Sequence, residues 1–254
     1  IRYQYGLFRQ YFEDGFQKET ADDWQRFGDP WSVRREEDAV TVQFGGQAVR
    51  AVPYDTPVIG YGMKTVNTLR LWQAEPFQAF DFNLFNAQKY AAAVRERDAA
   101  EDISRVLYPN DDTDAGKRLR LKQQYFFVSA TIQSIVRKHR AEYGTLRNFH
   151  LKHVIQINDT HPTLAIPELM RILLDECGYT WEKAFDITRR TFAYTNHTVM
   201  SEALEKWNED IFKKTLPRIY QICVELDHRC RADLERTFPG DEGKINYMAV
   251  LGDG

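Results

Sequence analysis

Three short clusters of polar residues stand out as places where this sequence could bind a ligand. They are Asn110 to Gly116, Asn158 to His161, and Asn196 to Thr198. Sugar hydroxyls need hydrogen-bond donors and acceptors in fixed directions, and Asn, Asp, His and Thr side chains supply both. The same residue types also favour turns and helix starts without any further function. The residues alone therefore leave two interpretations open, a polar binding site and simple loop capping.

The first cluster superficially resembles a calcium-binding loop, but its spacing is wrong. With Asp111 in the first position, Gly116 falls where the glycine belongs. However, the third position is Thr113 and the twelfth is Lys122, where a bidentate glutamate is needed. We therefore reject calcium. Among the basic residues that follow, Arg120 is expected to be partly buried, where it could pair with a carboxylate of the loop.

Two other kinds of chemistry, hydrolysis by paired carboxylates and metal binding, could also use residues of these clusters. A glycoside hydrolase would need paired carboxylates, and Asp111 or Asp112 together with Asp159 could flank a glycosidic bond. That alternative stays open. His161 and His197 come without an HExxH motif or a Cys/His set, so we expect no metal. Nor does the sequence contain a GxSxG, GxxxxGK[ST] or GxGxxG motif.

Hydrophobic periodicity predicts the elements that position the second and third clusters. A short apolar run over 154–157 indicates a strand, and a helix is expected from about Pro167 to Glu176. A further helix from Trp181 to about Phe192 precedes the third cluster. In open α/β sheets, ligand sites gather where strands end and helices begin. The pattern therefore predicts an α/β fold with two polar strand-end loops, and helices are expected to resume at Ser201.

The remaining elements are predicted from similar signals. Residues 38–53 read as a β-hairpin around Gly45 and Gly46, and Val66 to Trp72 suits a strand. Apolar residues at helical spacing predict a helix with one buried face from Leu119 to about Arg140. Gln88 to Ala100 is rich in alanine and charge, so we expect a helix outside the core, in solvent or against another subunit or domain. Ile211 to about Cys230 predicts one long amphipathic helix, with a proline near its first turn or at a kink.

Composition limits the kinds of binding partner and the cellular compartment that we expect. The 254 residues are 43% hydrophobic and contain 34 basic against 37 acidic residues. We therefore expect a buried core and no binding to nucleic acid or to a membrane surface. No apolar run approaches the roughly 20 residues needed to span a bilayer. Three cysteines without CxxC spacing indicate a reducing, cytoplasmic setting. The start at Ile1 and the turn-like end at Gly254 suggest that both ends are cuts within a longer protein.

Read as whole strings, these segments resemble the α-glucan phosphorylase family, which acts on glycogen, starch or maltodextrin. The matching strings are IRYQYGLF at 1–8, ADDWQRFGDPW at 21–31, PYDTP at 53–57, VNTLRLW at 66–72, RVLYPND at 105–111, GKRLRLKQQY at 116–125, INDTHPTLAIPELMR at 157–171 and FAYTNHTVMSEALEKW at 192–207. They run through nearly the whole chain in the family's order. This agreement is far more specific than any single motif.

The resemblance implies a fold, a reaction and a cofactor. The fold is the open α/β type with two Rossmann-like domains (GT-B), and residues 1–254 would be a single partial domain, the later part of the N-terminal one. Within it, 38–72 would be a β-rich insertion, 88–106 a projecting helix at a homodimer contact, and 110–116 a gate loop. The parent enzyme would cleave the terminal α-1,4 bond of a glucan with inorganic phosphate, with retention. Pyridoxal phosphate would be bound through the C-terminal domain and by no residue of this fragment, which alone would be inactive.

The resemblance also assigns roles to the strand-end clusters. His197 matches the histidine that contacts the glucosyl unit, and Asn196 and Thr198 flank it. Asp159 and His161 match the pair that lines the pocket on the glucan side. These five residues are the ones that we expect at the sugar.

In the gate loop the sequence partly departs from the family pattern. Asn110 and Asp111 match the loop, and Arg120 matches the arginine beneath it. Asp112 is a further candidate for substrate binding, although it, Thr113 and Asp114 stand where animal enzymes carry an asparagine and two aromatics. That change argues against direct sugar contact by Asp112.

Two further expectations concern regulation and the alternatives. Arg137 and Lys138 match the basic effector pair of the animal enzymes only in part, so we expect no control by AMP. A non-catalytic glucan-binding module is a second function to be considered, and an exposed aromatic platform would favour it. The hydrolase with paired aspartates is a third.

Overall fold

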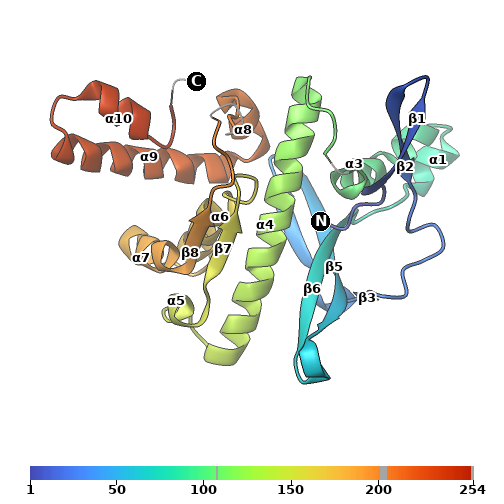
Figure 1. Ribbon diagram of the computed structural model, residues 1–254, viewed down its shortest axis with the longest axis horizontal. Coiled ribbons are helices and arrows are strands. Elements are labelled where there is room, and N and C mark those ends of the chain that lie inside the picture. The colour runs from blue at the N-terminus through green and yellow to red at the C-terminus, as the bar shows by residue number, and fades with distance from the viewer. Residues whose placement is uncertain (107, 201–204, 253–254) are drawn as a thin grey trace. The chain divides into compact units, whose positions relative to one another are not determined.

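The computed structural model describes residues 1–106, 108–200 and 205–252. The chain divides into two compact units, Ile1–Ser134 and Ile135–Gly254, called unit 1 and unit 2 (Figure 1). Helix α4 (Asp114–Tyr143) begins in the first and ends in the second.

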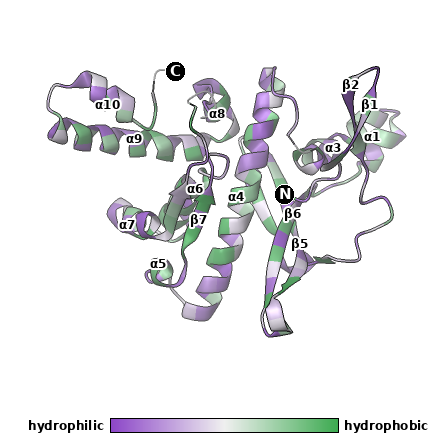
Figure 2. Ribbon diagram, in the orientation of Figure 1, coloured by the Kyte–Doolittle hydropathy of each residue, from purple (hydrophilic) through white to green (hydrophobic). Residues whose placement is uncertain are grey.

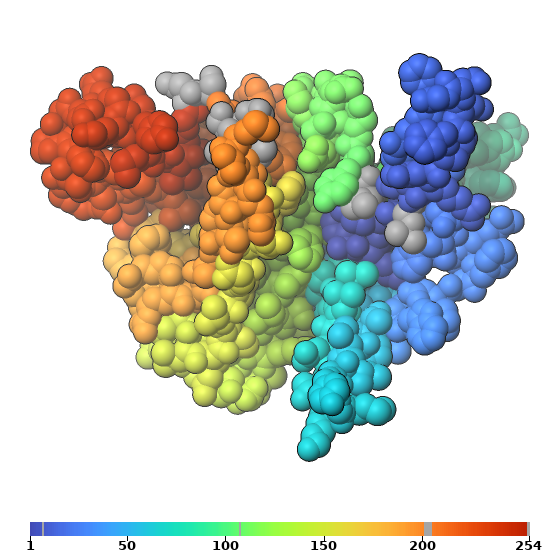
Figure 3. Space-filling model, in the orientation of Figure 1, coloured from blue at the N-terminus to red at the C-terminus, as the bar shows by residue number. Residues whose placement is uncertain are grey.

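Unit 1 is built on a four-stranded antiparallel sheet. Its long central strand β5 (Gln47–Ile59) pairs with β4 (Val40–Phe44) and β3 (Val33–Arg34) on one side and with β6 (Val66–Glu75) on the other. Phe44 pairs with Gln47 across the two-glycine turn, where Gly46 has a φ of 83°. The predicted hairpin and the predicted third strand are both confirmed. The tip of the β5–β6 hairpin (cyan) projects from the rest of unit 1 (Figure 3).

The core of unit 1 lies between this sheet and α4. The indole N–H of Trp72, from β6, donates to the Thr131 hydroxyl of the helix at 3.1 Å. The Phe44 ring meets the Tyr125 ring edge-on, with 5.8 Å between ring centroids. On the helix face that was predicted to be buried, four residues are buried and Ile135 is half-buried; the four are Leu121, Tyr125, Val128 and Ile132. The prediction of an amphipathic helix is therefore confirmed, and the helix is longer at both ends.

The region expected to form one helix from Gln88 to Ala100 is broken, and in this the prediction is wrong. It contains α2 (Tyr90–Ala93) and α3 (Arg95–Glu101), followed by a 3₁₀ turn at Asp102–Ser104, and α1 (Phe82–Asn86) precedes it. The break falls at Val94, which leaves the helical region with φ −116° and ψ 3°. Ala93, Ala100 and Ile103 are buried, and α3 packs against β6. Alanine is small enough to let the two backbones approach closely, so part of this region belongs to the core.

A second hairpin was not predicted from the sequence. Strands β1 (Leu7–Glu13) and β2 (Phe16–Asp22) are joined by Asp14 and Gly15, which have φ values of 50° and 79°. Two positive φ values define the type I′ turn that Asp-Gly favours. The dipeptide itself was the signal that could have identified this hairpin.

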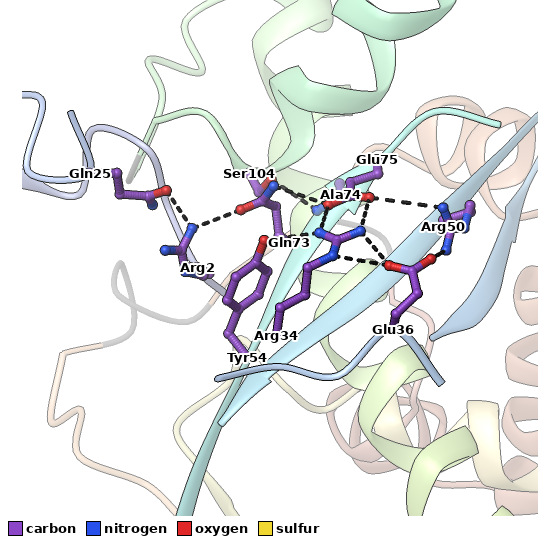
Figure 4. A network of polar contacts seen from close by, with 10 residues as sticks. All are labelled: Arg2, Gln25, Arg34, Glu36, Arg50, Tyr54, Gln73, Ala74, Glu75 and Ser104. Carbon is purple, nitrogen blue, oxygen red and sulfur yellow. Dashed lines mark hydrogen bonds and ion pairs between the residues drawn. The ribbon is translucent and has the colours of Figure 1, made fainter. Parts of the chain in front are cut away.

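A polar network ties the N-terminal residues and β3 to the edge of the main sheet (Figure 4). The Arg34 guanidinium bonds Glu75 and Glu36, and Arg50 bonds Glu36 as well. The hydrogen bond from Arg50, followed by that from Arg34, lowers the pKa of the Glu36 carboxyl. Nearby, the guanidinium of the buried Arg2 stacks 4.0 Å from the Tyr54 ring centroid. These contacts hold four separate segments of unit 1 in one arrangement.

Unit 2 contains a parallel strand–helix–strand unit. Strand β7 (Ile155–Asn158) pairs in parallel with β8 (Phe192–Thr195). Helix α6 (Ala165–Arg171), a π turn at Ile172–Glu176 and α7 (Trp181–Thr191) make the crossover. Strand β7 alternates the apolar Ile155 and Ile157 with the polar Gln156 and Asn158, and green hydrophobic segments are visible on its ribbon (Figure 2). The predicted order of strand, polar loop and helix is confirmed here, and the chain is a mixed α/β structure.

The predicted long helix from Ile211 is divided in two. Helix α8 (Glu209–Thr215) ends one residue before Leu216, and α9 (Pro217–Thr237) begins with its proline at the first helical position. Proline has no N–H to continue the first helix but fits the first turn of a new one. A short helix α10 (Glu242–Met248) follows, and α5 (Phe149–Lys152) precedes β7. The expected helix start at Ser201 lies outside the described residues.

None of the helices in the described parts of the chain is both long enough and apolar enough to cross a bilayer.

Candidate functional site

Two of the three polar clusters meet at the C-terminal edge of the parallel pair in unit 2. Asn158, the last residue of β7, pairs with Thr195, the last residue of β8. The pairing continues one residue further, because the Asp159 N–H donates to the Thr195 carbonyl at 2.9 Å. The loops that carry Asp159, His161 and His197 therefore leave the same edge of the sheet (Figure 1).

Asp159 makes the sharp turn that ends β7. Its φ of 68° lies in the left-handed region, which aspartate tolerates better than most residues. Its Oδ1 accepts from the Thr160 N–H at 2.7 Å, and the carbonyl of Thr160 accepts from the Thr163 hydroxyl at 2.7 Å. Here the loop-capping interpretation is correct, and it coexists with a half-buried carboxylate at the strand end.

His197 lies across the sheet edge from β7. Its Nε2 bonds the side-chain oxygen of Asn158. The two residues on either side of His197 form two hydrogen bonds with each other. The Asn196 amide donates to the Thr198 carbonyl at 3.1 Å, and the Thr198 N–H donates to Asn196 Oδ1 at 2.9 Å. His197 and Asn196 are exposed and Thr198 is half-buried, so the cluster is open to a ligand.

His161 faces an acidic residue that sequence reasoning missed. Its Nε2 lies 3.8 Å from the carboxylate of Glu205, whose side chain is only 19% exposed. The other Glu205 oxygen accepts from the Thr160 hydroxyl at 3.3 Å. Glu205 thus connects to both residues that follow Asp159. No local pattern pointed to it, because it stands 44 residues beyond His161 in a stretch that was expected to be simply helical.

The third cluster, the gate loop at 110–116, lies in unit 1. Asn110 and Asp112 are joined by two hydrogen bonds. The Asn110 amide donates to Asp112 Oδ2 at 2.8 Å, and the Asp112 N–H donates to Asn110 Oδ1 at 3.1 Å. Arg120 donates to Asp111 Oδ2 at 2.8 Å with 23% of its side chain exposed. The predicted burial of Arg120 and its pairing with a loop carboxylate are confirmed. Behind the loop, burial is the main cause that raises the pKa of the Tyr3 phenol to about 12.

Gly116 leaves no room for a side chain where α4 begins beside this loop. A Cβ atom there would stand 2.2 Å from the Asn110 carbonyl oxygen and 2.9 Å from the Asp111 Cα. We expect Gly116→Ala to lower the free energy of unfolding by about 1–3 kcal/mol, the usual cost of overpacking, because backbone must move. Gly243→Ala is the matched control: it meets only a side-chain oxygen at 3.7 Å, and alanine favours its helix. Urea unfolding of both variants should give changes of opposite sign, and an unchanged midpoint for Gly116→Ala would contradict the packing.

A pair of histidines anchors the chain just before β7. His139, on α4, is 1% exposed, and its Nδ1 lies 3.0 Å from Nε2 of His153. Its Nε2 donates to the Asn148 side-chain oxygen at 3.0 Å. In the tautomer with its proton on Nε2, the Nδ1 of His139 can accept from the Nε2–H of His153. Desolvation and the neighbouring His139 lower the pKa of His153, with Glu142 acting in the opposite direction.

This pair makes unit 2 sensitive to acid. A histidine whose pKa is depressed in the folded state contributes stability that is complete above the unfolded value of about 6.5 and is lost as the pH falls through the folded value. The free energy of unfolding should therefore drop as the pH falls below about 6.5. His153→Gln, which keeps an N–H donor, should flatten this dependence, whereas His228→Gln on the exposed face of α9 should preserve it. Equal slopes for the wild type and His153→Gln would refute this origin. Some pH dependence of the free energy of unfolding should remain in His153→Gln, because the pKa of His150 is also lowered, mainly by desolvation.

Two observations concern possible metal ligands and one lysine with a shifted pKa among the described residues. No group of three or more potential metal ligands occurs among the described residues. Lys122 has a pKa lowered by burial, but its ammonium donates to Gln47 at 2.6 Å and lies 5.6 Å from the Phe44 ring centroid. It is therefore engaged in packing against the β4–β5 turn and does not fit a cofactor lysine.

The chain is a mixed α/β protein with polar side chains gathered at one edge of its parallel strand pair. The chain belongs to the carbohydrate phosphorylase family, whose model matches residues 1–254. It is 42% identical over 270 residues to a glycogen phosphorylase of Synechocystis, with 99% of this chain and 32% of that protein covered. It is 46% identical to the liver form of human glycogen phosphorylase (99% and 32% covered) and to the bovine brain form (100% and 33%). The chain thus spans about a third of the length of these relatives.

Proposed function

We propose that this chain is part of an α-1,4-glucan phosphorylase. The whole protein uses inorganic phosphate to release the terminal glucosyl unit of glycogen, starch or maltodextrin as glucose 1-phosphate, with retention. One observation carries this proposal: the chain is similar from end to end to glycogen phosphorylases at 42–46% identity. The strand-end loops add support, since they present neutral donors and acceptors suited to sugar hydroxyls.

The residues of unit 2 are proposed to act on the sugar directly. His197 contacts the glucosyl unit, with Asn196 and Thr198 shaping the loop around it. Asp159 and His161 line the pocket on the glucan side, and Glu205 holds His161 and Thr160 in place. Side chains that are already fixed in position can stabilise the transition state without any reorganisation during the reaction.

In unit 1, Asn110, Asp111 and Asp112 are proposed to form a gate loop whose position depends on Arg120. The ion pair between Arg120 and Asp111 supports this role because it connects the loop to the first turns of α4. The mutual bonds of Asn110 and Asp112 use both side chains within the loop, which supports a structural role for Asp112 more than direct sugar contact.

Several wider features also belong to the proposal. The parent would be a cytoplasmic GT-B enzyme in which this chain is the later part of the N-terminal Rossmann-like domain. It would bind pyridoxal phosphate through residues outside this chain, and the cofactor's phosphate would assist proton transfer. The homodimer contact is proposed at the region 88–106. The exposed ring of Tyr90 within this region, and those of Phe80 and Phe85 just before it, support a buried interface in the parent.

The alternatives predict different products. The rings of Phe80, Phe85 and Tyr90 are tilted by 53° and 63° to one another, so they do not form the flat platform expected of a glucan-binding module. Maltodextrin should be incubated with the full-length protein with and without phosphate. Breakdown that requires phosphate supports a phosphorylase. Release of free sugar without phosphate would identify a hydrolase with paired aspartates, and binding without breakdown would identify a binding module.

The cofactor proposal has its own test. The chain alone should bind no pyridoxal phosphate and show no phosphorolysis, whereas the full-length protein should bind it stoichiometrically. Visible absorbance from cofactor bound to a lysine of the isolated chain would overturn this part of the proposal.

A further inference from the structure

We propose that Asn158 is a positioning residue for His197, and that its side-chain oxygen fixes the imidazole in the tautomer with the proton on Nε2. This inference rests on the proposed role of His197 at the sugar. It adds a residue to which the sequence and the family resemblance had given no function. The side chains involved come from the two adjacent strand ends of unit 2.

The strand register brings Asn158 close to His197. Asn158 and Thr195 are paired in the parallel ladder, and His197 follows only two residues later. Because Asp159 turns away in the left-handed conformation while its N–H stays bonded to Thr195, the end of β7 is held against β8. The side chain of Asn158 is thereby kept within reach of the loop that carries His197.

The hydrogen bond between Asn158 and His197 determines which ring nitrogen carries the proton. The amide oxygen of Asn158 can only accept a hydrogen bond, and it faces Nε2 of His197. A neutral imidazole has one N–H, so a proton on Nε2 leaves Nδ1 with a lone pair. His197 then presents a hydrogen-bond acceptor, to which a sugar hydroxyl can donate. The opposite tautomer would present a donor and lose the bond to Asn158.

The rest of the loop that carries His197 is fixed by contacts that do not involve Asn158. Asn196 and Thr198 bond each other, and Gln156, two residues before Asn158 on β7, donates to the Thr195 hydroxyl at 2.7 Å. The backbone therefore has other supports than Asn158. What Asn158 controls is the ring of His197, and specifically which nitrogen carries the proton.

The test measures the tautomer directly in this chain. Histidine labelled with ¹⁵N distinguishes the protonated ring nitrogen from the unprotonated one by NMR. The wild type should show His197 mainly with the proton on Nε2. Asn158→Ala should shift it toward a mixture, whereas Asn158→Asp should restore the wild-type tautomer because a carboxylate also accepts from Nε2–H. Gln156→Ala is the matched control, and it should leave the tautomer unchanged although it removes an amide that bridges the same two strands.

Kinetics of the full-length protein provide a second readout. Asn158→Ala should lower kcat/KM about 5- to 30-fold, the usual effect of one lost hydrogen bond. In Asn158→Asp the negative charge beside the ring should raise the pKa of His197, so the acid limb of the pH–rate profile should move to higher pH. A purely structural role would lower the rate without moving that limb.

The outcomes separate this inference from the proposed function. A wild-type His197 with its proton on Nδ1, or an Asn158→Ala variant with the wild-type tautomer, would overturn the positioning role even if the full-length protein is a phosphorylase. A full-length protein that breaks down no glucan would overturn the proposed function while leaving the NMR result in place.

Discussion

Replacing Arg171 by methionine should lower the free energy of unfolding by about 3–5 kcal/mol, because it uncouples a buried ion pair. The carboxylate of Glu168 is completely buried in α6. Arg171 donates to its two oxygens at 2.8 and 2.9 Å, through Nε and Nη2. Such a bidentate pair offsets the cost of removing a charge from water, and the cost returns when the guanidinium is lost.

The control for Arg171 is an arginine pair on the surface. Arg189 donates to Asp186 at 2.7 Å, but its side chain is 61% exposed. Arg189→Met should therefore change the free energy of unfolding by no more than about 1 kcal/mol. The double variant Glu168→Leu/Arg171→Met should recover much of the loss, since no buried charge remains. Urea unfolding measures all three. A loss below about 1 kcal/mol for Arg171→Met alone would show that this pair does not hold α6 in place.

The second large effect is expected for catalysis in the full-length protein. His197→Ala should lower turnover about 5- to 150-fold, which corresponds to the roughly 1–3 kcal/mol of a lost hydrogen bond to the sugar. The pyridoxal phosphate content should not change, because His197 is proposed to meet the sugar and not the cofactor. Steady-state kinetics test the expected loss of turnover, and cofactor absorbance tests the unchanged cofactor content. Unimpaired catalytic efficiency would remove His197 from the site, and a parallel loss of cofactor would mean that the substitution disturbs the whole fold.

Much of the fold could be predicted because its signals are local. The two glycines after Phe44 allow only a tight turn, and alternating apolar residues on both sides define the hairpin. The apolar face of α4 repeats at helical spacing over several turns, and the short apolar run that ends at Ile157 is typical of a strand. In each case the interaction that selects the structure lies within a few residues of the signal.

The errors arose where a non-local contact decides the outcome. The alanine-rich region was expected outside the core, but Ala93 and Ala100 are buried because small residues let α3 lie against β6. The break at Leu216 was ambiguous from sequence, since a proline can either kink a helix or start a new one.

In the candidate site, too, the features with local signals could be predicted and the non-local contacts could not. The clusters that contain Asp159 and His197 were predicted from residue type and position, and the parallel pairing of β7 and β8 brings their loops to one edge. Glu205 could not be predicted, because only the fold places it beside His161 and Thr160. Asn158 was seen as part of a polar cluster, but its specific contact with His197 depends on the strand register.

The most direct test of the account is a crystal structure of the full-length protein with a bound malto-oligosaccharide. We expect the terminal glucosyl unit at the C-terminal ends of β7 and β8, with a sugar hydroxyl within hydrogen-bond distance of the His197 side chain and with Asp159 or His161 lining the pocket. A glucan bound elsewhere, with His197 contacting no sugar atom, would contradict the assignment of this sheet edge as the sugar side of the site.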